Sequence, residues 1–303
     1  MKIEGFARFS LLLALAAGAL AARTPAPAIG SPGTVNYIEG SVSINNHQLS
    51  PGQPGQAVLG QNQTLSTSKG KAEILMSPGV FLRVGDNSAV RMIAPELVNP
   101  QVEVLRGIAM LEVDNKPKDA TITVLEHGAT VSVLKQGLYR FDSGRPSVAV
   151  IGGKLNVSEN GASKQIGKGK QIVLDDNRKL TAVNFDRNAK DDLYVWSEVR
   201  SSALAAANAS TAQYVYAGYA PFYGSGWYWN PAFGMYSWLP GNGFFYSPFG
   251  YPFYSVGVFP VYRGYYGVHR GFIARPHIGA GFVRHGFVNP GFRVAPHNSA
   301  HRR

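Results

Sequence analysis

The chain contains no cysteine among its 303 residues. This absence excludes a small scaffold held together by disulfides, and also a lipoprotein anchored through an N-terminal cysteine. The stability of the folded protein must therefore come from a buried core. A long hydrophobic run is missing too: the apolar stretch from Phe9 to Leu20 has about 12 residues, against the roughly 20 that span a bilayer.

The short apolar stretch is typical of a secretory signal. Lys2 and Arg8 precede it, and Ala19-Leu20-Ala21 satisfies the small-x-small rule of signal peptidase. We therefore expect residues 1–21 to be a signal peptide and residues 22–33 a Pro/Ala linker. The alternative is that the stretch is not cleaved and serves as a membrane anchor. The prediction places the mature chain in the periplasm or at the cell surface, without a transmembrane span.

Acidic residues and lysine are absent from residues 199–303. The same part holds eight arginines, five of the seven histidines and 12 of the 15 tyrosines. The net charge of +11 therefore belongs mostly to this part of the chain. Frequent Gly and Pro interrupt regular structure there, so residues 213–303 are predicted to form a low-complexity aromatic, Gly- and Arg-rich region.

Residues 34–184 show a different pattern, in which short alternating apolar runs are separated by Gly, Asn, Asp, Pro and Ser. Their spacing predicts about 14 to 16 strands. The expected fold class is all-β, with stacked hairpins that form a β-sandwich or β-roll. Within Val80–Val84, the residues Val80, Leu82 and Val84 should face the core, while Phe81 and Arg83 should face outward.

A ten-residue pattern recurs around Gly40, Gly107 and Gly153, and in a variant with one extra residue around Gly137. Each copy places an X-Gly pair between two apolar runs, as a tight turn requires when a residue takes positive φ. We interpret the pattern as a repeated hairpin. The copies are Val35–Ile44, Val102–Leu111, Val148–Val157 and Val131–Phe141.

One helix is predicted over residues 185–212, because no Gly or Pro interrupts this segment and helical spacing is present. It is expected to pack against the β domain, and the alternative is a spacer between the domain and the tail. The residues expected on the packed face are Leu193, Trp196, Val199 and Ala203.

The run from Gln63 to Ser88, with Thr67, Ala72 and Gly79 at characteristic spacings, resembles the core of the FecR-type domain. Later glycine and aliphatic elements through Val173 continue the resemblance, which covers residues 34–184. It implies a periplasmic β domain, which in the family senses an occupied outer-membrane siderophore receptor and controls an extracytoplasmic sigma factor. Sigma control uses a cytoplasmic segment, and only Met1 to Arg8 precede the apolar stretch here. A binding or sensing role is therefore expected ahead of sigma-factor signalling.

Motifs of catalysis and metal binding are absent from the sequence: it has no Gly-x-Ser-x-Gly elbow and no His-Glu-x-x-His. Gly161 to Lys168 resembles a P-loop, but its glycine spacing is wrong and Gly169 replaces the Ser/Thr, so a turn is predicted at Gly167-Lys168-Gly169-Lys170. The pairs Asp175-Asp176 and Asp191-Asp192 are expected at a turn and a helix start. We therefore predict no enzyme, no catalytic or metal site and no cofactor.

Two features of the C-terminal part could bind partners. The arginines and aromatic rings after Arg263 could hold an anionic envelope polymer, while export argues against intracellular nucleic acid. Histidines at 269, 277 and 285 are expected to be solvated rather than metal ligands. A second group of rings could stack on sugars or pack on the protein's own surface, and packing is the favoured alternative. Its members are Trp227, Tyr228, Trp229, Tyr236 and Trp238.

Together these features predict an exported, non-catalytic envelope module that binds or senses a protein or polysaccharide. The alternatives are a structural adhesion protein that acts through its basic aromatic tail, and a periplasmic signalling protein linked to sigma-factor regulation.

Overall fold

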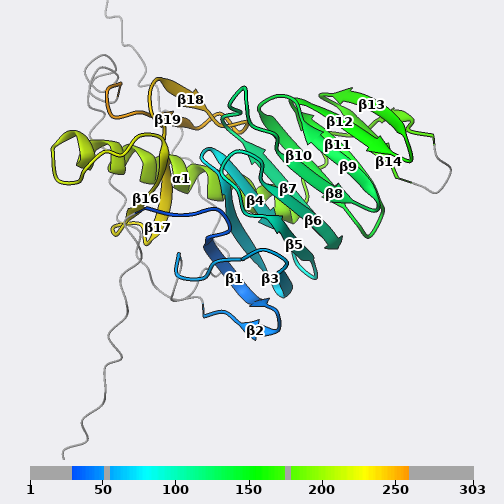
Figure 1. Ribbon diagram of the computed structural model, residues 1–303, viewed down its shortest axis with the longest axis horizontal. Coiled ribbons are helices and arrows are strands. Elements are labelled where there is room, and N and C mark those ends of the chain that lie inside the picture. Colours follow the sequence, from blue (N-terminus) through cyan, green and yellow to red (C-terminus); the bar gives the residue numbers. More distant parts are fainter. Residues whose placement is uncertain (1–28, 51–54, 175–178, 259–303) are drawn as a thin grey trace, which may run out of the picture.

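The computed structural model describes residues 29–50, 55–174 and 179–258 (Figure 1). The chain forms a large β-sheet, one helix and two small hairpins. The expectations for the signal peptide, for most of the linker, for Asp175-Asp176 and for the Arg- and His-rich end concern residues outside the described ranges.

Fifteen strands lie between Val35 and Asn184 and join in one sheet, which confirms the all-β fold class. Their number agrees with the number of alternating runs in the sequence. The strands are β1 (Val35–Ile44), β2 (His47–Gln48), β3 (Thr64–Ser77), β4 (Val80–Val84), β5 (Ala89–Ala94), β6 (Gln101–Arg106), β7 (Ile108–Val113), β8 (Thr123–Glu126), β9 (Ala129–Val133), β10 (Gly137–Asp142), β11 (Ser147–Gly152), β12 (Lys154–Glu159), β13 (Ala162–Gly167), β14 (Lys170–Val173) and β15 (Ala182–Asn184).

The long strand β3 is where the two halves of the sheet meet. Its first residues, Thr64–Ser66, pair with β5, and its last part, from Ala72 to Ser77, pairs with β4. One half continues from β5 through β6, β8, β9 and β12 to β13, and the other from β4 through β7, β10, β11 and β14 to β15. Strand β1 runs antiparallel to β3 along both parts.

One hydrophobic core contains side chains from both halves of the sheet, so the sheet curls over and encloses it. Val90 and Val124 come from one half, and Leu111 and Val148 from the other. All four are less than 2% exposed. Each strand contributes alternate residues to this core, as the period of two in the sequence predicts.

The prediction of a repeated hairpin is wrong, although three of its four glycines, Gly40, Gly107 and Gly153, do take positive φ. Strands β6 and β7 flank Gly107 (φ 74°), yet they do not pair with each other: β6 pairs with β5 and β8, whereas β7 pairs with β4 and β10. The chain therefore passes from one half of the sheet to the other at Gly107. A Cβ there would lie 2.2 Å from Ser88 Oγ, which leaves room only for glycine.

Two of the other copies of the pattern mark the same kind of crossing. Gly153 separates β11 from β12, which belong to opposite halves, and the segment before Gly137 joins β9 to β10 in the same way. Gly40 lies inside β1, opposite Gly70 of β3, at a bulge in the pairing. Local patterning identified where the backbone bends, but pairing partners are set by long-range contacts.

Helix α1 spans Asp192–Tyr216 and begins and ends later than the predicted 185–212. Asp191 is its N-cap, as expected for an acidic pair at a helix start: the Asp191 side chain accepts a hydrogen bond from the Tyr194 amide at 2.8 Å. The helix packs against the outer face of β4 and β7, so the alternative of an isolated spacer is excluded. Of the predicted packed face, Leu193 is buried and Trp196 and Ala203 pack partly buried against hydrophobic clusters, whereas Val199 is 56% exposed.

The buried stripe of α1 is rich in polar residues, which explains why hydrophobic spacing identified only part of it. It includes Leu193, Ser197, Arg200, Ser201, Leu204, Asn208, Thr211 and Val215. These positions follow the three-and-four spacing of a helix face that packs on one side. Arg200, Ser201 and Asn208 form hydrogen bonds with partners on other elements.

Two hairpins follow the helix, β16 (Gly226–Asn230) with β17 (Met235–Leu239), and β18 (Phe244–Tyr246) with β19 (Pro252–Tyr254). Asn208 of α1 joins them, because its amide donates to the carbonyls of Trp238 and Tyr254, each at 2.9 Å. This part of the region predicted as low-complexity is therefore folded. Figure 1 shows both hairpins beside α1, at the opposite end of the molecule from β13 and β14.

The helix and the first hairpin cover the outer face of the β4 half of the sheet. Val80, Leu82 and Val84 lie in the main core as predicted, and Phe81 and Arg83 do alternate to the other side. However, Phe81 and Arg83 are also fully buried. The expectation that they face solvent is wrong, because a second layer that the alternation could not reveal lies over them.

Candidate functional site

The five aromatic residues that could have stacked on sugars lie mostly inside the protein. Trp227, Tyr236 and Trp238 are no more than 1% exposed and pack with Leu75 and Phe81 of the sheet. Tyr228 is 6% exposed, and Trp229 is half-buried. Trp227, Tyr236 and Trp238 form a second hydrophobic core between the first hairpin and the sheet, with Trp229 packed against it. Tyr228 packs in a separate cluster with Val215 of α1 and Leu239, so these rings pack on the protein itself, as the packing alternative proposed.

A cluster of charged side chains lies beside this second core, on the outer face of β3, β4 and β7. Glu73, Arg83 and Glu112 come from these three strands and are each 0% exposed. Arg83 donates to Glu73 through Nε at 3.1 Å and forms an ion pair with Glu112 through Nη1. The pairing satisfies charges that could not otherwise be buried.

Arg200 of α1 completes the cluster from the other side. Its Nη2 lies 2.9 Å from Glu73 Oε1, and its guanidinium group lies 4.0 Å from the centre of the Tyr37 ring. Ser201, the next residue, donates to Glu112 Oε1 at 2.6 Å. Two acids of the sheet thus each contact one residue of the helix.

The first hairpin is tied to the same cluster by Asn36 of β1. The Asn36 amide donates to Glu73 Oε1 at 2.9 Å and to the Tyr236 carbonyl at 3.1 Å, and its oxygen accepts from the Tyr236 amide at 2.8 Å. Burial alone would raise the pKa of Glu73, but the charges of Arg200 and Arg83 and the hydrogen bonds from Arg200 and Asn36 hold it below its usual value.

Asp114 is the fifth acidic or basic member of the cluster and differs from the others. It is 1% exposed, and neither of its carboxyl oxygens has a hydrogen-bond partner among the described residues when the group is ionised. Burial, and then the adjacent charge of Glu112, raise the pKa of Asp114 well above its usual value. With Asp114 protonated, two arginines balance two carboxylates, so the cluster is electrically neutral.

The buried cluster acts as a joint between layers. Its five charged side chains are at most 5% exposed, so a ligand cannot reach them without separation of α1 from the sheet. The arginines of the cluster neutralise its glutamates through ion pairs. Among the described residues, no group of three or more His, Asp or Glu side chains is arranged to hold a metal ion.

A surface that a partner can reach lies at the C-terminal end of α1. Five aromatic residues there are between 42% and 71% exposed. They are Tyr214, Tyr216, Tyr219, Phe222 and Tyr223. We call this group the aromatic end.

The helix terminus orients part of the aromatic end. Gly218 takes φ 79° directly after the C-cap Ala217, the Tyr219 amide donates to the Tyr214 carbonyl at 3.1 Å, and the Gly218 amide donates to Val215 at 3.0 Å. These are the two hydrogen bonds of a Schellman motif. The rings of Tyr214 and Tyr219 also meet, with centroids 5.3 Å apart.

The loop after the motif is fixed by the buried Tyr228. Its hydroxyl accepts from the Tyr223 amide at 2.8 Å and donates to the Gly224 carbonyl at 2.9 Å, and its ring stacks on Phe222. The exposed rings therefore stand on a backbone held by hydrogen bonds. Residues 201–258 contain no Asp, Glu, Lys, Arg or His, so the aromatic end has no formal charge of its own.

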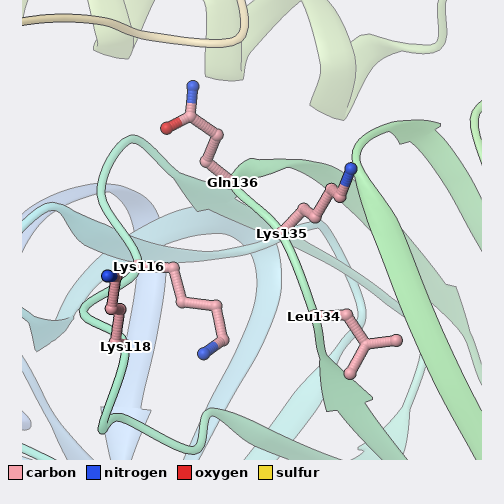
Figure 2. A pocket seen from close by; sticks show the side chains of 5 residues that line it. All are labelled: Lys116, Lys118, Leu134, Lys135 and Gln136. Carbon is pink, nitrogen blue, oxygen red and sulfur yellow. The ribbon is translucent and has the colours of Figure 1, made fainter.

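A second surface feature is an open hollow of about 420 Å³ between two loops of the β domain. Figure 2 shows Lys116 and Lys118 on the loop between β7 and β8, and Leu134, Lys135 and Gln136 on the segment between β9 and β10. Sequence reasoning singled out neither this hollow nor the aromatic end. The Ala217-Gly218 stop signal before a run of aromatics could have indicated the second of these.

The fold and its surfaces define a class of protein: an all-β domain with a helix and two hairpins attached to its outer face. Two crystal structures of a candidate anti-sigma factor from Parabacteroides distasonis ATCC 8503 are similar to it. One is 18% identical with a TM-score of 0.36 and covers 41% of this chain and 61% of its own. The other is 17% identical with a TM-score of 0.37 and covers 45% and 64%.

The matches thus span less than two thirds of the length of either solved chain. No protein-family model and no curated protein sequence matches this chain. Among the described residues, no helix is both long and apolar enough to cross a membrane.

Proposed function

We propose that this chain is an exported, non-catalytic binding module of the FecR type, and that it contacts a neutral glycan through the aromatic end. The observation that carries the proposal is the set of exposed rings at the fixed terminus of α1, within a part of the surface that lacks formal charge. Exposed aromatic clusters are uncommon on soluble proteins unless they serve an interface.

The chemistry of the surface favours a sugar over a charged partner. The C–H faces of sugar rings suit flat aromatic side chains, and a tyrosine ring combines an apolar body with a polar tip. Residues Ser201 to Val258 supply no formal charge to recognition. Because hydrogen bonds hold the loop at Tyr223 and the turn at Gly218, little conformational entropy would be lost on binding.

A non-catalytic role is supported by the position of the acids that resemble catalytic groups. Glu73, Glu112 and Asp114 have charged neighbours and perturbed environments, which are frequent in active sites. All three are enclosed between the sheet and α1, and Glu73 and Glu112 are paired with arginines. Their role in the proposal is therefore to hold the helix that presents the aromatic end.

The test is affinity electrophoresis of the full chain through gels that contain a soluble neutral glucan, laminarin or dextran. We expect retardation of the wild-type protein by at least one glucan, and loss of most of it in the Tyr223→Ala variant. Tyr246→Ala is the matched control, since Tyr223 and Tyr246 are 66% and 57% exposed. Equal retardation of both variants, or no retardation of the wild type by a panel of neutral glucans, would overturn the proposal.

A further inference from the structure

The hollow between the β7–β8 and β9–β10 loops has an unusual concentration of positive charge. Three of its five lining residues are lysines, Lys116, Lys118 and Lys135, and none is acidic (Figure 2). Among the described residues, none of the three forms an ion pair. Asp119 is exposed in the same loop but does not line the hollow.

Backbone contacts leave the charge of these lysines uncompensated. Lys116 Nζ donates to the Ala120 carbonyl at 2.8 Å and to the Pro117 carbonyl at 3.4 Å, both of which are neutral acceptors. The three lysines give the lining of the hollow a positive charge, which would attract a bound anion.

The segment that carries Lys135 is held in place from several sides. The hydroxyl of the buried Tyr139 donates to the Lys135 carbonyl and accepts from the Lys154 amide at 3.2 Å. The Leu134 amide donates to the Lys154 carbonyl at 2.9 Å. A Cβ at Gly137 would lie 2.1 Å from the Gly152 carbonyl oxygen, so the backbone passes very close to its neighbour. One wall of the hollow is therefore preformed in the absence of ligand.

The opposite wall is connected to the same strands. The Val133 amide donates to the Ile122 carbonyl at 3.0 Å, which links the end of β9 to the end of the Lys116 loop. Lys116 itself closes that loop through its bond to Ala120. The separation of the two loops is thus set by the sheet, and the lysine side chains are the adaptable part.

We propose that this hollow is a binding site for a phosphate group carried by a small molecule or a lipid headgroup. Lysine binds phosphate as a point charge on a mobile side chain, whereas arginine, which is absent from the lining, recognises carboxylate and phosphate through bidentate hydrogen bonds. The Gln136 amide adds an uncharged donor, and the exposed side of Leu134 suits an apolar stem next to the phosphate. A volume of about 420 Å³ lies within the range of small-molecule sites.

This site is independent of the neutral aromatic end. The dependence of binding on ionic strength distinguishes the two proposals. Binding at the hollow must weaken as ionic strength rises, whereas binding of a neutral glucan at the aromatic end should not. Failure of one proposal therefore leaves the other standing.

The experiment compares two triple variants of the full chain. Lys116→Gln/Lys118→Gln/Lys135→Gln removes the charge of the hollow, and Lys69→Gln/Lys164→Gln/Lys168→Gln removes the same charge from exposed lysines outside it. Both keep the arginines of residues 259–303, so their contribution cancels. Unchanged circular dichroism and thermal midpoint confirm folding, and the single variant Lys135→Gln provides a milder test.

Affinity is measured by titration calorimetry with inorganic phosphate and with glycerol 1-phosphate, and by cosedimentation with phosphatidylcholine vesicles that contain phosphatidylglycerol. We expect the hollow variant to bind at least about tenfold more weakly than the wild type, and the control to change by less than about twofold. Loss with the soluble probes indicates a free phosphate ligand, and loss with vesicles alone indicates a lipid headgroup. Equal loss in both triple variants, or no wild-type binding to any probe, would refute the site.

Discussion

Arg200 of helix α1 and Glu73 of strand β3 form a buried ion pair, with Arg200 Nη2 2.9 Å from Glu73 Oε1, although 127 residues separate them in the chain. The pair connects the β domain to the helix, and through Asn36 the first hairpin joins the same group. The aromatic end stands on the helix that this pair holds. Stability of the joint and presentation of the binding surface are therefore connected.

Arg200→Met should destabilise the protein by about 3–5 kcal/mol, because it leaves the fully buried Glu73 carboxylate with one arginine fewer. The free energy of unfolding from urea denaturation gives the measurement. Val199→Ala is the control, since Val199 is 56% exposed on the same helix and should change stability by less than about 0.5 kcal/mol. A loss below about 1 kcal/mol for Arg200→Met would show that the pair does not hold the layers together.

Two neighbouring acids should differ in how much stability is lost when each is replaced by its amide. Burial and the adjacent charge of Glu112 raise the pKa of Asp114 and favour its neutral form, which Asp114→Asn imitates, so this substitution should cost less than about 1 kcal/mol at pH 7. Glu112→Gln removes the ionised partner of Arg83 and should cost about 3–5 kcal/mol. Urea denaturation of both variants at pH 7 tests this, and similar losses would contradict the protonation of Asp114.

Glu126 should make stability depend on pH in the weakly acidic range. Burial raises its pKa from 4.5 to about 7, and the negative charges of Asp142 and Glu103 add to this, while the Ser143 hydroxyl at 2.8 Å opposes it. The folded state thus holds a proton that the unfolded state releases above pH 4.5. Its contribution is complete below pH 4.5 and is lost as pH rises through about 7, a decrease of about 3 kcal/mol.

The measurement for Glu126 is the free energy of unfolding between pH 4 and 8 for the wild type and for Glu126→Gln. The variant cannot titrate at this position, so the difference between the two proteins should shrink or change sign in favour of the variant as pH rises. Parallel pH curves would show that Glu126 has an ordinary pKa in the folded protein.

Two glycines with similar backbone conformation should differ in their tolerance of alanine. A Cβ added at Gly161 (φ 81°) would meet no atom within 4 Å, so Gly161→Ala should cost only the left-handed backbone penalty of about 1–2 kcal/mol. At Gly153 (φ 95°) a Cβ would lie 2.2 Å from the Tyr139 hydroxyl and 2.6 Å from the Gln136 carbonyl. Gly153→Ala should therefore cost about 1–3 kcal/mol more.

Thermal midpoints of the two alanine variants, measured under one set of conditions, give the comparison. Equal midpoints would mean that the crossing at Gly153 is less tightly packed than its contacts indicate. The Lys135 segment lies beside this crossing, so Gly153→Ala should also weaken phosphate binding at the hollow.

Part of the fold could be predicted because the relevant physics is local. The period of two in Val80–Val84 separated Phe81 and Arg83 from the core-facing residues, and the glycines at 40, 107 and 153 marked positions of positive φ. The structural role of these glycines could not be predicted from the neighbouring residues alone. A glycine at a hairpin and a glycine at a crossing between sheet halves have the same conformation, and only the partners of the flanking strands distinguish them.

The candidate sites were harder to predict from the sequence for a related reason. Trp227 and Trp238 are of a residue type that can stack on sugar rings, yet they are buried. Tyr219 and Tyr223 of the same region are exposed. The three lysines of the hollow lie in two separate loops, and the sheet alone brings the loops together. Composition indicates what a side chain can do, but the fold decides which side chains meet.

The sequence by itself determined an alternating, glycine-punctuated β chain without disulfides and a change of composition near Glu198, because side-chain period and backbone permissiveness are properties of neighbouring residues. Only the tertiary structure decided that the outer face of β4 and β7 is covered, and that Ser197, Arg200 and Asn208 form the buried face of α1. The physical reason is that a polar group can be buried only beside its partner. For Arg200 that partner, Glu73, lies in another element far along the chain.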